Sequence, residues 1–274
     1  MRFSITASIL ALGTVSQVLA YPSFFPENGL VGLTGDTDRS NIPHEIEGDD
    51  PNQWIPPKEG DGKWFVGNDF NLANHGYLPR NGRDISESQL YDVMFKVAGI
   101  DKAGVDTLGG KEALKFSSTG TFSLDDLNAH DVIEHDCSLS RDNSQSGNNW
   151  SFDAQIWATV SSFFNTPLVS TMQLGRAIKF RQDSDPLNDP ARALSPEANM
   201  RSLIDAAVLW RVFHNGEGAN LAWINTLFEQ ERLPFAEGWD FPSERISSFE
   251  ILDTAVSIGL DIILGQRESG TMDS

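Results

Sequence analysis

The chain has 274 residues, 39% of them hydrophobic, and its 20 basic and 39 acidic side chains give a formal net charge of −19. A chain of this length can bury a large core, and we expect one globular domain. The acidic balance disfavours nucleic acid and anionic membrane as partners. Because Cys137 is the only cysteine, an intramolecular disulfide is excluded.

The first 20 residues are typical of a secretory signal peptide. Arg2 supplies the positive start, residues 5–15 the apolar run and Ala20 the small residue at the cleavage site, so the mature chain would begin at Tyr21. No later apolar run reaches the ~18 residues of a membrane span. We therefore expect a soluble, secreted monomer or weak dimer, with an N-glycosylation motif at 149–151.

Residues 21–63 are rich in proline, glycine and aspartate, which predicts an extended N-terminal arm, anchored by Trp54. A helical domain over 64–266 and a C-terminal tail over 267–274 would follow. Near its start we expect a short helix that is closed by Gly76 and stopped by Pro79. His75, next to that cap, is either a structural histidine or a ligand.

Capping and breaking signals place the next elements. Ser86 to Gln89 form a capping box before a helix that should end at Gly99, and residues 102–122 suggest a loop or a small hairpin. The pattern Ser123-x-x-Asp126 starts a helical periodicity that reaches Ile133. Residues 134–136 would then lie at the C-terminal end of that helix.

The segment from Glu134 to Arg141 (EHDCSLSR) combines two carboxylates, an imidazole, a thiol and two hydroxyls. The Glu134 carboxylate, the Ser138 hydroxyl and the free carbonyls of a helix end are the oxygen donors that Mg²⁺ or Ca²⁺ prefers. The alternative is a polar helix end with a structural histidine. The Cys137 thiol is either a small buried group or a reactive one.

The C-terminal half is predicted to be helical throughout. Apolar stripes cover 152–163 and 174–180, a helix starts at Ser195-Pro196-Glu197 and runs to about Phe213, and two more cover 219–229 and 247–264. With about eight helices and hardly a strand, we predict an all-α fold. Asp205 falls within an apolar stretch, where it is either turned to water or held for a purpose.

Three blocks of the sequence resemble the fungal chloroperoxidase family, the haem-thiolate peroxidases and unspecific peroxygenases. They are LANHGYLPR at 72–80, EHDCSLSR at 134–141, and ERLP at 231–234 with the pair GW at 238–239. The resemblance implies a chloroperoxidase-like helical protein that binds haem b. It also implies oxidation of a small organic molecule by hydrogen peroxide, as a tailoring step in fungal secondary metabolism.

The resemblance also implies roles for individual residues. The Glu134 carboxylate, the His135 carbonyl and the Ser138 hydroxyl would bind Mg²⁺ or Mn²⁺ beside a haem propionate. His135 and a carboxylate on a later helix would assist peroxide cleavage. That carboxylate falls at Asp205, one methylene shorter than the family's glutamate, with Glu197 as the alternative.

The axial iron ligand is where the sequence departs from the family. Its members carry a Pro-Cys-Pro tripeptide ahead of the first block, and this chain has Phe65-Val66-Gly67 there. Valine cannot bind iron, so Val66 marks a missing ligand. Three hypotheses remain: a peroxidase-like enzyme with an altered haem ligand such as His75, a haem-free enzyme that uses acid–base residues for cyclisation, dehydration or hydrolysis, and a non-catalytic binding protein.

Overall fold

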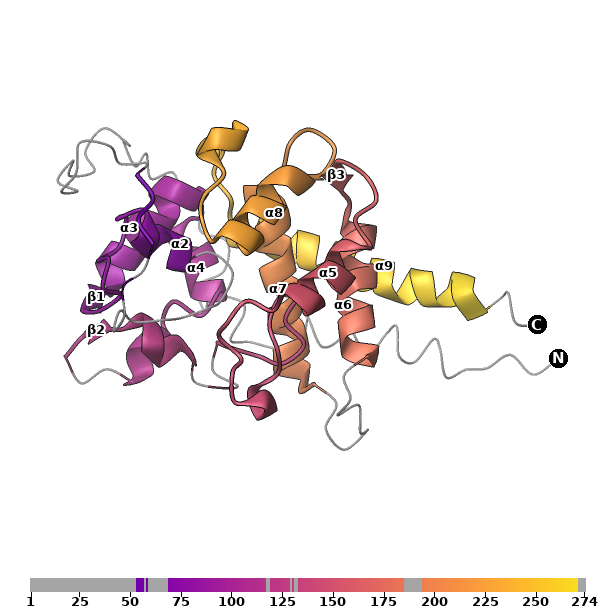
Figure 1. The fold of residues 1–274 in the computed structure, drawn as a ribbon, viewed down its shortest axis with the longest axis horizontal. Helices are drawn as coiled ribbons and strands as arrows, with labels where there is room; N and C mark the ends of the chain where they lie inside the picture. Colours follow the sequence, from indigo (N-terminus) through magenta and orange to yellow (C-terminus); the bar gives the residue numbers. More distant parts are fainter. Residues whose placement is uncertain are drawn as a thin grey trace.

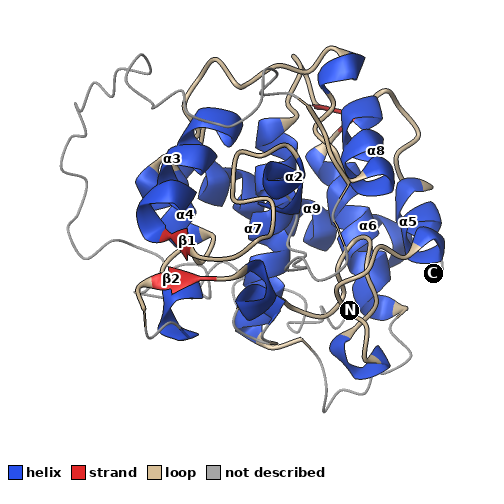
Figure 2. Cartoon of the chain, turned by 60° about the vertical axis from the view of Figure 1, so that its left-hand side comes forward, coloured by secondary structure: helices blue, strands red, loops and turns tan. Residues whose placement is uncertain are grey.

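A computed structural model describes residues 53–56, 58, 69–116, 119–128, 130, 133–184 and 194–270. Over this part the chain forms eight α-helices and four two-residue strands (Figure 2), as predicted for an all-α fold. No helix of the described part is long and apolar enough to cross a membrane. The predicted signal peptide, most of the predicted arm and Val66 lie outside the described residues.

The helices are α2 (Asp69–Asn74), α3 (Glu87–Ala98), α4 (Lys102–Thr107), α5 (Ala154–Ser161), α6 (Thr171–Asp183), α7 (Pro196–Val212), α8 (Leu221–Gln230) and α9 (Ser248–Gly270). Two antiparallel pairs are formed by the strands β1 (Ile85–Ser86) with β2 (Thr121–Phe122), and β3 (Leu168–Val169) with β4 (Ala219–Asn220). Helix α9 continues past its predicted end at residue 264 (Figure 1).

Side-chain caps fix the starts of α3, α7 and α9 where the sequence placed them. The Ser86 hydroxyl accepts from the Gln89 amide at 3.2 Å at the start of α3, and Gly99 ends that helix with φ 69°. Ser195 caps α7 in the same way, and Ser247 and Glu250 form the capping box of α9. These local hydrogen bonds satisfy amides that have no partner inside the helix.

The expectation of a loop or hairpin over 102–122 is largely wrong. The segment begins with α4, capped by Asp101, whose Oδ1 accepts from the Gly104 amide at 2.7 Å. The short strand β2 does form, but it pairs with β1, Ile85 opposite Phe122. This pairing joins segments far apart in the sequence, so local turn signals could not indicate it.

The predicted helix up to Ile133 is also wrong. A 3₁₀ helix, η4 (Leu124–Asn128), takes its place, and His130 pairs with Glu134 in a parallel β-bridge. The buried Leu124 and Leu127 are three residues apart, a spacing that a 3₁₀ turn satisfies as well as an α-helix. Residues 134–136 therefore lie in a loop and not at a helix end.

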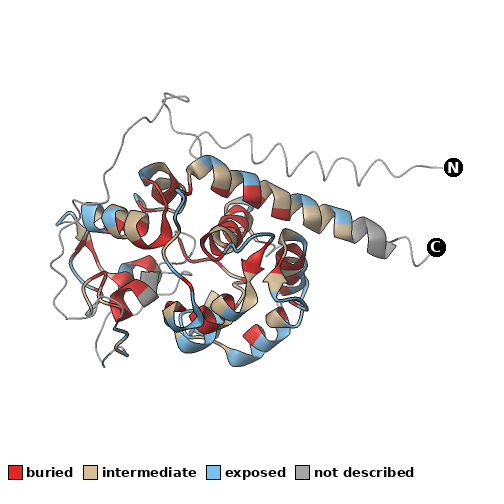
Figure 3. Cartoon of the chain, turned by 90° about the horizontal axis from the view of Figure 1, so that it is seen from above, coloured by how far each residue is buried: buried red, intermediate tan, exposed pale blue. Residues whose placement is uncertain are grey.

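The largest part of the core lies where α6, α7 and α9 pack against one another (Figure 1). Helix α7 is buried on most sides, and in Figure 3 the buried residues, in red, gather in the interior between the helices. Its buried positions are Ala198, Met200, Ser202, Leu203, Ile204, Ala206, Ala207, Val208, Leu209 and Val212. Helix α7 thus runs through the interior of the fold, and its charged residues lie at its partly exposed positions.

The crossing of α6 and α9 depends on Gly175. A Cβ atom there would lie 3.1 Å from the Ile258 carbonyl oxygen and 3.2 Å from Ile262 Cγ1. We expect Gly175→Ala to lower the free energy of unfolding by about 1–3 kcal/mol, because the helices would have to move apart. Gly259→Ala is the matched control, since its nearest neighbour, Leu203 Cδ1, is 3.5 Å away.

Urea denaturation of the two variants separates close packing from helix propensity. Gly259→Ala should be neutral or should stabilise by up to ~1 kcal/mol, because alanine favours the helix. Equal stability of the two variants would contradict the close approach of α6 and α9.

Candidate active site

The first and third sequence blocks lie against each other. His75 is 2% exposed, and its Nε2 accepts a hydrogen bond of 3.0 Å from the Leu233 amide. The ring packs edge-on against Phe235 at 5.6 Å between centroids. Because Nε2 is an acceptor here, the proton of a neutral His75 is on Nδ1. His75 therefore holds two loops together. Of the two roles that the sequence left open for it, this is the role of a structural histidine.

The described part of the predicted arm joins the same junction. The Trp54 indole N–H donates to the Glu231 carbonyl at 2.9 Å, and the Ile55 amide donates to the Asn74 carbonyl at 3.0 Å. The Asn74 side-chain amide also reaches the Glu231 carbonyl, at 3.4 Å. Trp54 is thus an anchor, as predicted.

A buried guanidinium brings the second block into this arrangement. Arg141 is 3% exposed, and its Nε donates to the Trp150 carbonyl at 3.4 Å. Burial lowers the pKa of Arg141 to about 9, against the opposing charge of Glu231. Burial in turn raises the pKa of Glu231, and the charge of Arg141 opposes that shift. The two charges partly compensate each other's loss of hydration.

The loop after Glu134 is fixed by its own polar groups. Cys137 has φ 62°, and its amide donates to Asn143 Oδ1 at 2.8 Å. From α6, Arg181 Nε donates to the Ser138 carbonyl at 2.9 Å and its Nη2 to the Arg141 carbonyl at 3.3 Å. The loop is therefore bonded to a helix on one side and to itself on the other.

His135 is held between a carbonyl and a carboxylate. Its Nδ1 lies 2.7 Å from the Asp136 carbonyl oxygen, which can only accept, so Nδ1 carries a proton. Its Nε2 lies 3.3 Å from Asp205 Oδ2 on α7. Burial opposes a charge on this ring, but the hydrogen bond and charge of Asp205, with the Asp136 carbonyl, raise the pKa of His135 above its ordinary value.

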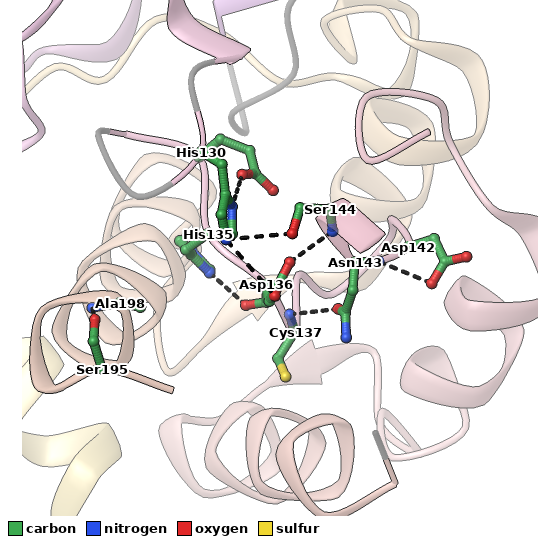
Figure 4. A network of polar contacts seen from close by, with 10 residues as sticks. His130, His135, Asp136, Cys137, Asp142, Asn143, Ser144, Ser195 and Ala198 are labelled. Carbon is green, nitrogen blue, oxygen red and sulfur yellow. Dashed lines mark hydrogen bonds and ion pairs between the residues drawn. The ribbon is translucent and has the colours of Figure 1, made fainter. Parts of the chain in front are cut away.

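On the other side of the loop, a second histidine lies between two carboxylates. His130 Nδ1 is 2.6 Å from Glu134 Oε2, and His130 Nε2 is 3.9 Å from Asp136 Oδ2. Ser144 donates its amide to Asp136 Oδ1 at 2.7 Å, and its hydroxyl is 3.3 Å from His130 Nε2. Figure 4 shows His130, Ser144 and Asp136 directed towards one another.

The structure thus brings together most of the residues that the sequence singled out. Asp205, and not Glu197 near the start of α7, is the carboxylate in contact with His135. Glu134 is 5% exposed, and its carboxylate contacts His130. Ser138 belongs to the same loop, where its hydroxyl oxygen is 3.5 Å from the Ser140 amide. The predicted roles of these residues remain predictions.

Sequence reasoning missed His130, Asn143, Ser144 and Arg181. Only His130 left a signal, because a histidine four residues before Glu134 and six before Asp136 is a spacing of potential metal ligands. The predicted helix obscured that signal, because a helix over these residues would turn Asp136 away from His130 and Glu134. The others are placed by the loop conformation, which periodicity does not predict.

Comparison with known proteins identifies a family for this chain. The family model described as "Peroxidase, family 2" matches residues 70–244, which include all three blocks, His135 and Asp205. The chain belongs to this family, the chloroperoxidase family. An aromatic peroxygenase from Coprinellus radians is 28% identical over 141 residues, which are 44% of this chain and 54% of that protein. The match thus spans about half the length of this curated relative.

The family implies haem, and the described residues fit it on one side only. The pair of the buried His135 and the partly exposed Asp205 suits the side on which peroxide is cleaved. For the axial position, His75 Nε2 is occupied by the Leu233 amide, and Cys137 is buried within the His135 loop. Val66 itself carries no donor. The residues described here do not fit a thiolate-ligated haem.

The charge of Asp205 should control the protonation of His135. We expect Asp205→Asn to lower the pKa of His135 in metal-free protein, measured by NMR titration of the histidine ring nitrogens. Because the pKa of His135 is raised in the folded state, protonated His135 stabilises the fold at pH values below its ordinary pKa of ~6.5. That contribution is lost as the pH rises through the folded-state pKa. The variant should therefore lose most stability near pH 5–6.

Asp253→Asn, at an exposed position of α9, is the control and should leave the pKa of His135 unchanged. A pKa of His135 that stays the same in Asp205→Asn would mean that the contact with Asp205 does not form.

Proposed function

We propose that the protein oxidises a small organic molecule with hydrogen peroxide, using His135 and Asp205 as its acid–base pair. The observation that carries the proposal is the 3.3 Å contact between the buried His135 and the partly exposed Asp205 in a member of Peroxidase, family 2. The name of the similar protein, aromatic peroxygenase, favours an aromatic substrate.

The roles of the two residues follow from their hydrogen bonds. The Asp136 carbonyl fixes the proton on Nδ1, so Nε2 is the nitrogen that exchanges a proton. Asp205 stabilises the protonated ring and keeps Nε2 in position. Such a pair can accept a proton from one oxygen of the peroxide and deliver it to the other. General acid–base catalysis of this kind accelerates a reaction by a factor of ~10²–10⁴.

Other parts of the proposal rest on the sequence and on the family. We assign haem b as the redox group, with Mg²⁺ or Mn²⁺ bound near Glu134, the His135 carbonyl and Ser138. The motif at residues 1–20 supports secretion, and the one at 149–151 supports glycosylation. We further propose that the protein is a monomer or weak dimer and that it acts in fungal secondary metabolism.

The test is peroxide-dependent oxidation of a phenolic substrate after reconstitution with haem. We expect His135→Gln to lower kcat by ~10²-fold or more, because glutamine cannot exchange the proton. His214→Gln, at an exposed position after α7, is the matched control and should keep full activity. Equal rates for wild type and His135→Gln would exclude His135 from proton transfer.

A second candidate is a haem-free enzyme that uses the same pair for cyclisation, dehydration or hydrolysis. The observation that favours it is the engagement of His75, which removes the histidine that the sequence offered as a replacement ligand. The haem content of purified protein separates the two candidates. One haem per chain supports the peroxidase, and none, together with no peroxide-dependent turnover, supports the haem-free enzyme or a binding protein.

The spectrum of any bound haem tests the position of Val66. We expect the reduced protein with carbon monoxide to lack the red-shifted Soret band of thiolate ligation, because valine has no donor atom. Val66→Cys should restore that band if the rest of the proximal pocket is kept. A thiolate spectrum from the wild-type protein would contradict this expectation and would leave Cys137, the only cysteine, as the ligand.

A further inference from the structure

A pocket of about 340 Å³ lies at the C-terminal end of α7. It is bordered by Val212 in the last turn of that helix, by Trp223 on α8 and by the segment 239–246 that continues from the third sequence block. None of its lining residues belongs to the loop at 134–141. Asp205 lies roughly 10 Å from Val212 along the helix axis, so the pocket is separate from the His135–Asp205 contact.

Hydrogen bonds at both ends fix the segment that forms one wall of this pocket. At its start the Trp239 indole N–H donates to the Val212 carbonyl at 3.2 Å. At its end the Ile246 amide donates to the Gly99 carbonyl at 2.8 Å, and the Asp101 amide donates to the Ile246 carbonyl at 3.1 Å. All the residues between, 240–245, line the pocket. The wall is therefore formed by bonds within the protein and needs no ligand to shape it.

Aromatic rings make up the apolar lining. Trp223 donates its indole N–H to the Glu237 carbonyl at 3.0 Å, and the N–H of Trp239 is already engaged by α7. The Trp239 and Phe241 rings pack edge-on at 5.9 Å between centroids, and Phe235 supports both from the core, at 5.2 and 5.5 Å. Because both indole donors have acceptors, these side chains offer a ligand ring surface and not hydrogen bonds.

Two arginines line the pocket, but each is paired with groups that do not. Arg211 Nε donates to Thr254 Oγ1 at 2.7 Å, and its Nη2 is 3.7 Å from Asp253 Oδ2. Arg245 Nη2 donates to Asp101 Oδ2 at 3.0 Å. None of these three partners lines the pocket. The positive charges are therefore compensated from outside it, which leaves little attraction for an anion.

Three carboxylates line the same pocket. Glu250 Oε2 accepts from the Ser247 amide and hydroxyl, both at 2.8 Å, in the capping box of α9. Asp240 Oδ1 accepts from the Phe241 amide at 2.7 Å, a bond that leaves its charge in place. Within the described part of the chain, neither Asp240 nor Glu244 forms an ion pair. The balance of charge that a ligand meets is therefore negative.

The end of α7 adds to this negative potential. A helix carries about half a negative charge at its C-terminus, where a cation is favoured. His214, which also lines the pocket, packs its ring against Trp210 at 4.3 Å between centroids, so the ring is directed at the helix. The pocket thus combines aromatic surface with a negative potential, and its volume falls in the range of ~300–1,000 Å³ that is usual for small-molecule sites.

We propose that this pocket binds a small organic cation, a quaternary or protonated amine with an apolar body. The aromatic rings would attract the cation through their π faces, and Asp240 and Glu244 would supply the opposite charge. The inference goes beyond the proposed function, because it assigns a second binding site and involves neither haem nor peroxide.

The experiment uses benzyltrimethylammonium as the probe on the full mature chain, without haem or peroxide. A titration followed by the ¹⁵N–¹H signals of the indole groups should show saturable binding at one site. The signals of Trp223 and Trp239 should shift, and those of Trp54 and Trp150 should not. Phenylacetate, an anion with the same ring, should bind at least ~10-fold more weakly, because the cation–π attraction and the charge of the carboxylates are both lost.

Matched variants test the aromatic and the charged parts separately. Trp223→Leu should weaken binding of the probe by ~10-fold, because leucine keeps an apolar side chain but has no π face. Trp150→Leu changes an exposed tryptophan elsewhere and should have no effect. Glu244→Gln should weaken binding by ~2–5-fold, the range for an exposed charge pair. Glu197→Gln, near the other end of α7, is its control.

Three results would overturn the proposal. Tighter binding of phenylacetate than of the cation would mean that Arg211 and Arg245 dominate the pocket. Binding of the probe without a shift at Trp223 would place the cation elsewhere, and no binding by folded wild-type protein would exclude the site. If Trp223→Leu does not fold, Glu244→Gln at the surface still decides. The measurement does not depend on peroxide turnover, so failure of this site and failure of the peroxidase proposal remain distinguishable.

Discussion

The contact between His135 and Asp205 joins the loop that follows the β-bridge to the most buried helix of the fold. A buried imidazole must have partners for both ring nitrogens, since an unpaired one would lose its hydration without compensation. The loop supplies one partner through the Asp136 carbonyl, and α7 supplies the other. The position of the ring is therefore set by two separate elements of the fold.

The same helix orders the rest of the site. The Trp239 indole N–H, from the third block, donates to the Val212 carbonyl at 3.2 Å, at the end of α7. That block also holds His75 through Leu233 and faces Arg141 through Glu231. The three blocks are thus bonded to α7 or to one another.

The parts of the fold that sequence predicted are those with a local cause. Ser86, Ser195 and Ser247 cap helices by hydrogen bonds within four residues, and such signals are readable from sequence alone. The failures have non-local or degenerate causes. Strand β2 depends on a partner more than 30 residues away, and the spacing of Leu124 and Leu127 suits two kinds of helix.

The residues of the candidate site can also be divided into those that the sequence indicated and those that depend on the local conformation of the chain. His135 and Asp205 were found through motifs, and their contact required only that the loop meet α7. The surroundings of Glu134 were not found, because they depend on a bridge and on a left-handed residue, Cys137, that no periodicity indicates. An error in the local conformation thus concealed His130 although its position in the sequence was plain.

This loop conformation has a consequence for how the two histidines divide their work. Consecutive residues of an extended segment point to opposite sides, so Glu134 and His135 cannot both direct their side chains to one place. Glu134 and Asp136, two residues apart, can share a side with the bridged His130, while His135 faces α7. The helix that the sequence suggested would have mixed these sides, since its residues turn by about 100° each. The bridge therefore places the carboxylates of Glu134 and Asp136 on the side of His130 and leaves His135 to its contact with Asp205.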